Sequence, residues 1–231
     1  MTQRKIQYWV IPPKENGQFV ANMENVLGIY KRPYDERFPV VCMDEQPVQL
    51  LEEVNLPIAA TKNHARRADY EYKRCGTVSI FMFCEPLAGW RDVAVRERRT
   101  KEDWAIEMRR LLTGRYATAE KVTLVCDNLN THVTGAFYET FAPQEARSVL
   151  DRLDLQYTPK HGSWLNIAEN ELSSMTRQAM QGRRFGTLES IEHQLSCWAT
   201  STNEKQRGVD WQFTVDDSRN KLKHLYPKIK C

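Results

Sequence analysis

The sequence lacks the features that mark membrane-spanning and secreted proteins. No apolar run approaches the roughly 20 residues that a helix needs to cross a bilayer. The first residues, MTQRKIQYWVIPPKENG, contain neither the apolar core nor the small-residue cleavage site of a signal peptide. Internal repeats and low-complexity segments are also lacking. These absences point to a globular protein with no membrane partner.

Regular cysteine spacing and a strong excess of one charge are missing as well. The six cysteines form no C-x-x-C pair, and Cys42, Cys84 and Cys126 lie in or beside apolar runs. A free cysteine in such a place behaves as a small buried hydrophobe. This usage is typical of a reducing cytosol, so we expect a cytoplasmic protein without a disulfide framework or a cysteine-based zinc site. A net charge of +3 is too small to prove a nucleic-acid partner.

The 231 residues, 41% of them hydrophobic, suffice for one large domain. Apolar spacing predicts both helices and strands, with a polar linker at 31–39 and a basic, irregular tail at 206–231. The expected helices cover 18–30, 100–114, 133–142, 166–181 and 187–203, and the expected strands lie at 40–43, in the first part of 77–90, and at 91–98, 121–126 and 153–158. Strands mixed with helices in this order indicate an α/β domain built on a mixed sheet.

Two of the expected strands end on an aspartate. VVCM leads into Asp44, and KVTLVC leads into Asp127. In α/β sheets the ends of strands open into crevices where sites form. Each aspartate also has an ordinary explanation, because Asp shapes turns through hydrogen bonds to nearby backbone groups.

Glu169 has two explanations of the same kind. Asn166 followed by Glu169 fits a helix N-cap with an acidic partner three residues later. Alternatively, Glu169 joins the two aspartates to hold a hard cation such as Mg²⁺, which prefers oxygen ligands. Two such ions about 4 Å apart promote in-line phosphoryl transfer.

Three stretches carry a resemblance to a known family. CMDEQ, VCDNLNTH and PKHGSWLNIAENEL resemble the acidic motifs of bacterial insertion-sequence transposases related to mariner. In that family a D, a D-N followed by a nearby His, and an L-N-x-x-E form a DDE triad on a ribonuclease-H-like fold. The resemblance implies a ribonuclease-H-like mixed β-sheet flanked by helices. It divides the chain into an N-terminal helix and linker (1–37), a DDE catalytic domain (38–205) and a basic C-terminal tail (206–231).

By this resemblance Asp44, Asp127 and Glu169 are the catalytic residues and the ligands of two Mg²⁺ ions, for which Mn²⁺ can substitute. The spacing from Asp127 to Glu169 is longer than in mariner itself, and APQEARSVLDRLD resembles an insertion found in one bacterial branch. Glu171 is therefore a rival to Glu169, and Glu45 a weaker rival to Asp44. Residues two apart on a helix point about 200° apart, so only one of the two glutamates can face the aspartates. The L-N-x-x-E match favours Glu169.

Further residues are candidates for DNA contact. His132 matches the family's D-N-x-x-x-H, which places it near the scissile phosphate, although it can also be a local hydrogen-bonding residue. Lys160, His161 and Trp164 precede the Glu169 helix on an expected loop, where a cation and an aromatic ring suit phosphate contact and base stacking. Trp164 fits the edge of the core equally well. Several basic runs, among them the one with Arg183 and Arg184, would form a DNA-binding groove if they shared one face.

The implied function is metal-dependent cleavage and strand transfer of double-stranded DNA, at transposon ends and target, in cut-and-paste transposition by a homodimer in the bacterial cytoplasm. Family members carry helix-turn-helix modules ahead of the catalytic domain, and only 43 residues precede Asp44. We therefore expect a separate DNA-recognition half. Two other functions remain open: a catalytically silent DNA-binding or dimerisation remnant, and a ribonuclease-H-like nuclease acting on other nucleic acids.

Overall fold

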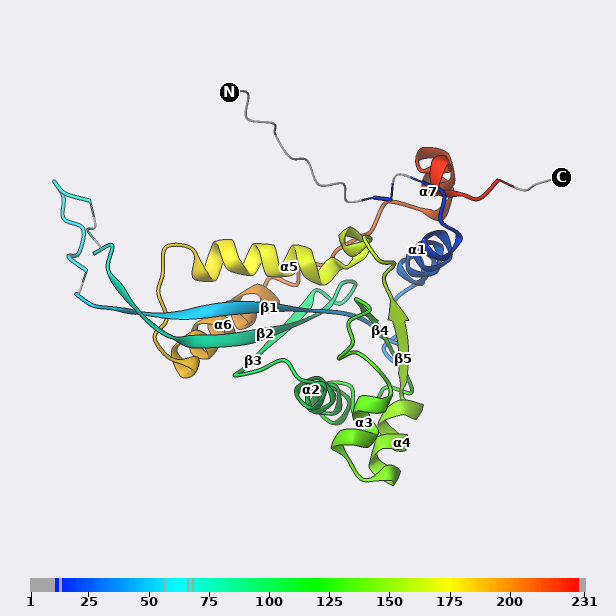
Figure 1. Ribbon diagram of the computed structural model, residues 1–231, viewed down its shortest axis with the longest axis horizontal. Coiled ribbons are helices and arrows are strands. Elements are labelled where there is room, and N and C mark those ends of the chain that lie inside the picture. The colour runs from blue at the N-terminus through cyan, green and yellow to red at the C-terminus, as the bar shows by residue number, and fades with distance from the viewer. Residues whose placement is uncertain (1–10, 13, 56, 66, 68, 229–231) are drawn as a thin grey trace.

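A computed structural model of the chain describes residues 11–228 except 13, 56, 66 and 68 (Figure 1). Expectations for the first ten and the last three residues lie outside this part. The main elements are, in chain order, α1 (Gly17–Tyr30), β1 (Val40–Glu53), β2 (Tyr72–Glu85), β3 (Trp90–Arg96), α2 (Lys101–Thr113), β4 (Val122–Cys126), α3 (Gly135–Thr140), α4 (Pro143–Asp151), β5 (Leu153–Tyr157), α5 (Ile167–Met175), α6 (Leu188–Asn203) and α7 (Val215–Lys221). A π-helical turn (Thr176–Met180) extends α5. None of the described helices is long and apolar enough to cross a membrane.

The five strands form one mixed sheet in the order β3-β2-β1-β4-β5. β1, β2 and β3 are antiparallel neighbours, and β4 runs parallel to both β1 and β5. The mixed α/β sheet expected from the sequence is therefore confirmed. Because the parallel strands β1 and β4 end at the same edge, the residues that follow their paired segments lie close together.

Helices cover both faces of the sheet (Figure 1). Side chains alternate along β1, so Cys42 joins one apolar core, and Val41 and Met43 join the other. The first core contains side chains from α1, α5 and α6, and the second contains side chains from α2, α3 and α4. We call these the α5 face and the α2 face. Consecutive residues of β1 therefore meet different surroundings.

β1 is longer than the sequence indicated, which corrects the expectation of a strand that ends at Asp44. It continues to Glu53, paired with β2, whereas its pairing with β4 stops at Cys42 opposite Val125. Beyond that point one edge of β1 is free of β4, so Pro47, which lacks a backbone donor, is tolerated. Asp44 thus lies where β1 separates from β4, and β1 and β2 continue as a two-stranded arm that projects from the body (Figure 1).

Two other expectations need correction. The single helix expected at 133–142 is two helices, α3 and α4, because Phe141 is extended and Pro143 begins a new helix at its first position. The tail from residue 206 onward is not irregular throughout, because it contains α7. Thr214 and Asp217 form a capping box there, with each side chain hydrogen-bonded to the other's backbone N–H.

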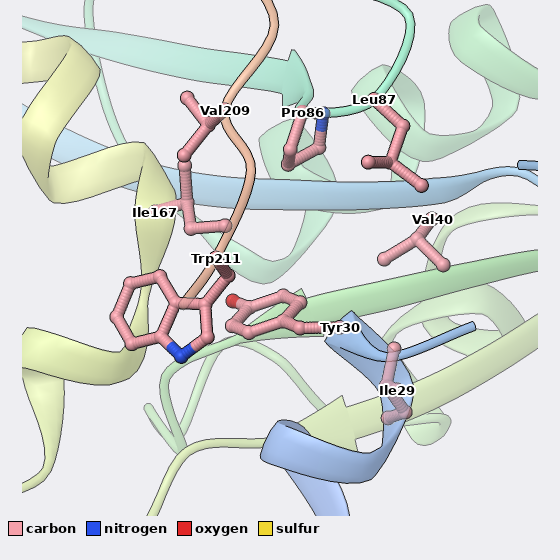
Figure 2. A pocket seen from close by; sticks show the side chains of 8 residues that line it. All are labelled: Ile29, Tyr30, Val40, Pro86, Leu87, Ile167, Val209 and Trp211. Carbon is pink, nitrogen blue, oxygen red and sulfur yellow. The ribbon is translucent and has the colours of Figure 1, made fainter. Parts of the chain in front are cut away.

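The C-terminal segment packs onto the α5 face of the domain. Trp211 lies against Tyr30 of α1, with ring centroids 5.3 Å apart. Together with Val209 and Ile167, the first residue of α5, they line a small apolar pocket (Figure 2). The Tyr30 hydroxyl donates to the Leu165 carbonyl at 2.7 Å. Tyr30 of α1 and the segment with Val209 and Trp211 therefore help to fix the residues that lead into α5.

Candidate active site

Asp44 and Asp127 meet at the edge where β1 leaves β4. Asp44 shares the α5 face with Cys42, two residues earlier, and Asp127 directly follows β4. Burial raises the pKa of Asp44 from 3.8 to about 7, and the negative charges of Asp127 and Glu169 add to the rise, while a hydrogen bond from the Glu45 N–H opposes it. The carboxyl of Asp44 therefore senses both other acids of the expected triad.

Glu169 lies in the first turn of α5 and does not cap that helix. The Asn166 side chain accepts from the Ala168 N–H at 3.1 Å, so the cap is made by Asn166 alone. The N–H of Asn166, which a capping glutamate would bind, already donates to the Ser163 carbonyl at 2.7 Å. Helices α2, α6 and α7 each begin with a capping box, in which the N-cap side chain and the side chain three residues later bind each other's backbone N–H. Among the described residues, α5 has only the cap bond that the Asn166 side chain accepts. This arrangement leaves the Glu169 carboxylate for another use.

Glu171, the rival of Glu169, is committed to a buried ion pair. Its two carboxylate oxygens accept from Nε and Nη2 of Arg91 on β3, at 3.0 and 2.7 Å. Arg91 is 5% exposed and Glu171 is 8% exposed. A bidentate pair of this kind is strong and directional. Glu171 points toward β3, which leaves Glu169 as the glutamate of α5 that acts on Asp44.

Glu45, the rival of Asp44, is on the opposite side of β1. Its Oε1 lies 3.1 Å from Nε2 of His132, which is fully buried. Nδ1 of His132 lies 3.1 Å from the Asp127 carbonyl oxygen and 2.8 Å from its Oδ1. Burial opposes the charge of His132, but hydrogen bonds to Asp127, Cys126 and Glu45 raise its pKa to about 12. His132 therefore contacts Asp127 from the buried α2 face of the sheet. Its ring has no solvent-exposed surface that could contact a DNA phosphate.

Lys160 and His161 border an open groove of about 490 Å³ that also contains Asp127. They lie in a tight turn closed by a hydrogen bond from the Gly162 N–H to the Pro159 carbonyl, 2.8 Å long. His161 has a φ of 64°, a left-handed conformation that is uncommon for a residue with a side chain. A Cβ on Gly162 would lie 2.4 Å from Cγ of Pro159, so the turn requires glycine. The structure thus places Lys160 and His161, both candidates for DNA contact, in the same groove as Asp127.

The other candidates for DNA contact are placed differently. Trp164 is half-buried and packs edge-on against Phe213 with ring centroids 5.8 Å apart, which fits a residue at the edge of the core. Arg184 pairs with Glu53 at 2.6 Å and donates to the Glu71 carbonyl at 2.8 Å, so it fastens the arm to the body. Arg183 is exposed. Of this group, Arg183 alone faces solvent freely enough to contact DNA without rearrangement.

The acids suit a hard divalent cation in their donor chemistry. No three His, Cys, Asp or Glu side chains within the described ranges are already grouped tightly enough to hold one ion. Mg²⁺ needs only one or two protein carboxylates, because it keeps several waters. Burial is the main cause of the raised pKa of Asp44, and the negative charges of Asp127 and Glu169 add to it. The carboxylates of Asp44, Asp127 and Glu169 match the donor chemistry of such an ion.

The sequence family described as DDE superfamily endonuclease matches residues 39–192, more than half of the chain. The chain belongs to the DDE superfamily endonucleases. The match begins just before β1 and ends within α6, so it contains all three acids. No curated protein sequence matches this DDE superfamily endonuclease.

Solved structures of the Mos1 mariner transposase share the fold. A Mos1 paired-end complex with Mn is 16% identical, with a TM-score of 0.55, over 89% of this chain and 62% of that chain. A pre-cleavage Mos1 transpososome is 15% identical, with a TM-score of 0.57, over 99% and 68% of the two chains. The ribonuclease-H-like fold expected from the sequence is thereby confirmed. This DDE superfamily endonuclease spans about 62% of the length of the first of these relatives.

Sequence reasoning missed several residues that shape the site. Arg91, which binds Glu171, and Asn203, which holds the backbone of Arg91, did not stand out in the sequence, because their partners are distant along the chain. The role of Glu45 was also missed. The alternation of side chains along a strand could have predicted it, because neighbouring residues such as Asp44 and Glu45 lie on opposite faces of β1.

Proposed function

We propose that this chain is the catalytic domain of a transposase that cleaves and joins DNA strands in cut-and-paste transposition. The observation that carries the proposal is the placement of the acids: Asp44 and Asp127 lie where β1 separates from β4, and Glu169 lies in the first turn of α5. The negative charges of Asp127 and Glu169 add to the rise that burial causes in the pKa of Asp44. Membership in the DDE superfamily endonucleases supports it. The similar Mos1 structures, which include a strand transfer complex and paired-end complexes with Mn or Mg, support the reaction class and the choice of metal.

In this proposal Asp44, Asp127 and Glu169 hold two Mg²⁺ ions, with Mn²⁺ able to substitute. Bound there, such ions supply positive charge for the phosphoryl-transfer transition state and lower the pKa of the attacking water or 3′-hydroxyl. His132 keeps the Asp127 carboxylate in place. Lys160 and His161 lie beside Asp127 in the groove, where they bind the DNA backbone by charge and hydrogen bonding.

The wider assignment is that of a bacterial insertion-sequence transposase acting in the cytoplasm. Residues 38–205 form the catalytic domain, with 1–37 and 206–231 as flanking segments. A homodimer is supported by the segment that connects β1 to β2 at the end of the arm, which exposes large apolar side chains. Tyr70 is 84% exposed, and Val54 and Ile58 are also exposed. Large apolar side chains exposed on a projecting segment are typical of a protein interface.

Cleavage of labelled duplex DNA that carries the transposon ends tests this function. The protein is supplied with Mg²⁺ or Mn²⁺ and with a target duplex. We expect metal-dependent nicks at the ends and joined products in which the new 3′-hydroxyl is linked to target DNA. A wild-type protein that binds these duplexes but cuts none of them favours the silent remnant. Equal cleavage of RNA–DNA hybrids and of duplexes without ends favours a general nuclease.

A further inference from the structure

The helix that carries Glu169 is fastened to the sheet at two buried points, one on each side of this residue. Three residues before Glu169, the Nδ2 of Asn166 donates to the Met43 carbonyl at 2.9 Å. Met43 is the residue directly before Asp44. One amide side chain, 1% exposed, therefore joins the start of α5 to the backbone beside the first acid of the triad.

Asn166 does two separable things. Its Oδ1 caps α5 at the Ala168 N–H, and its Nδ2 reaches across to β1. Capping alone is met equally well by serine, which ranks with asparagine at this position. Only the amide has both an acceptor for the helix and a donor long enough for the strand. The choice of asparagine is therefore explained by the link to β1.

The second point lies two residues after Glu169, where Glu171 binds Arg91 through both oxygens. Arg91 is itself fixed, because its backbone N–H donates to Oδ1 of Asn203 at 2.7 Å and its carbonyl accepts from Nδ2 of Asn203 at 2.8 Å. The pair thus connects α5, β3 and α6. Since residues two apart point in nearly opposite directions, fixing Glu171 against β3 also fixes the direction of Glu169.

We infer that Asn166 and the Arg91–Glu171 pair are positioning residues that set the place of the Glu169 carboxylate relative to Asp44. The inference rests on the proposed function, because the distance between these two acids matters only if they share a cation. Buried groups that orient a metal ligand affect metal affinity by about 10–100-fold when they are changed. A buried ion pair, by contrast, is often replaceable by apolar residues without loss of stability.

Two variants separate positioning from stability. Asn166→Ser keeps the helix cap and removes the amide link to β1. Arg91→Met combined with Glu171→Leu replaces the ion pair by apolar side chains, and avoids the unpaired buried charge that either single change would leave. Thr187→Ala is the control, because it removes the cap of α6 on the same face without touching α5.

The measurement is Mn²⁺ binding to the full chain without DNA, by electron paramagnetic resonance titration, together with the unfolding midpoint in urea. We expect both variants to bind Mn²⁺ about 10–100-fold more weakly. The double variant should keep most of its midpoint, and Asn166→Ser should lower it, because the buried Met43 carbonyl loses its donor. We expect Thr187→Ala to lower the midpoint and leave Mn²⁺ affinity unchanged. In a Glu169→Gln background the positioning changes should add nothing, because they act through that carboxylate.

Equal Mn²⁺ affinity of the wild type and both variants overturns the inference while leaving the proposed function in place. Full additivity with Glu169→Gln also overturns it, because the affected ligand is then another residue. If the wild-type protein itself binds no Mn²⁺ and cleaves no DNA, the proposed function fails, and the inference falls with it.

Discussion

Acids that are neighbours in the sequence lie on opposite faces of the sheet and have different electrostatic surroundings. On the α5 face, Asp44 faces Asp127 and Glu169, and their like charges add to the rise in its pKa. On the α2 face, Glu45, the very next residue, is buried against His132. α5 repeats the contrast, because Glu171 is paired with Arg91 while Glu169 is not. Glu45 and Glu171 are each paired with a buried basic side chain, whereas Asp44 lies among other acids. Asp127 combines both conditions, because His132 contacts its carboxylate at 2.8 Å.

Glu169→Gln should have the largest effect on activity. Loss of a metal ligand removes several kcal/mol of transition-state stabilisation, so we expect DNA cleavage to fall by roughly 10³-fold. Stability should not fall, because the Glu169 carboxylate does not cap α5. Cleavage rates and urea unfolding of the purified variant check both parts. A loss of activity that merely tracks unfolding would show that Glu169 is structural.

Arg91→Met should have the largest effect on stability. The change leaves the Glu171 carboxylate buried without its partner, which costs about 3–5 kcal/mol in the free energy of unfolding. Adding Glu171→Leu should restore most of this loss. Urea unfolding of the single and double variants measures the difference. If the single variant is as stable as the wild type, the pair is not the structural counterpart of Glu169.

Asp44→Asn should stabilise the metal-free protein, on the order of 2 kcal/mol, because the folded state raises the pKa of this carboxyl from 3.8 to about 7. Between these values the folded wild type binds more protons than the unfolded chain, so its stability falls as pH rises through this window. The variant should lack this pH dependence. Thermal unfolding without metal at pH 5 and pH 8 tests it, and identical profiles for both proteins would contradict the raised pKa of Asp44.

Glu24→Gln should have the smallest effect. Glu24 of α1 accepts from Arg219 of α7 at 2.9 Å, and this hydrogen bond contributes most to the lowering of its pKa. Because Arg219 is largely exposed, the pair is worth only about 0.5 kcal/mol. A lowered pKa stabilises the fold above the ordinary glutamate range, and this contribution is lost as pH falls below it. Urea midpoints should differ at pH 7 and converge near pH 3.

Local patterns in the sequence predicted much of the fold. The helix at 18–30 and the capped helix at 100–114 are confirmed as α1 and α2, because their apolar spacing and caps are local signals. The length of β1 was not predictable in this way, since acids and Pro47 argue against a strand. The second part of β1 is a strand because it pairs with β2, which begins only at Tyr72, so no local sequence pattern indicates it. α4 had a local signal, Pro143 ahead of the buried Ala146 and Val149, that was interpreted as an insertion.

The candidate site shows the same division. Asp44, Asp127 and Glu169 were proposed from their motifs, and the structure shows their mutual influence at Asp44. What separates them from Glu45 and Glu171 was not visible in the sequence. That distinction depends on His132 and Arg91, which reach these glutamates only through the folded sheet. His132 itself was assigned to the correct neighbourhood by its distance from Asp127, but its burial depends on the packing of α2 and α3.

The most direct test of the difference between Glu169 and Glu171 is nicking of supercoiled plasmid DNA across a Mn²⁺ titration. It compares the wild type, Glu169→Gln and Glu171→Gln. We predict that the wild type nicks the plasmid, that Glu171→Gln needs more Mn²⁺ but nicks at saturation, and that Glu169→Gln nicks at no concentration although it is folded. Nicking by Glu169→Gln at the wild-type rate would contradict this assignment of the two glutamates. So would loss of nicking at every Mn²⁺ concentration in a Glu171→Gln protein that is folded by its urea unfolding curve.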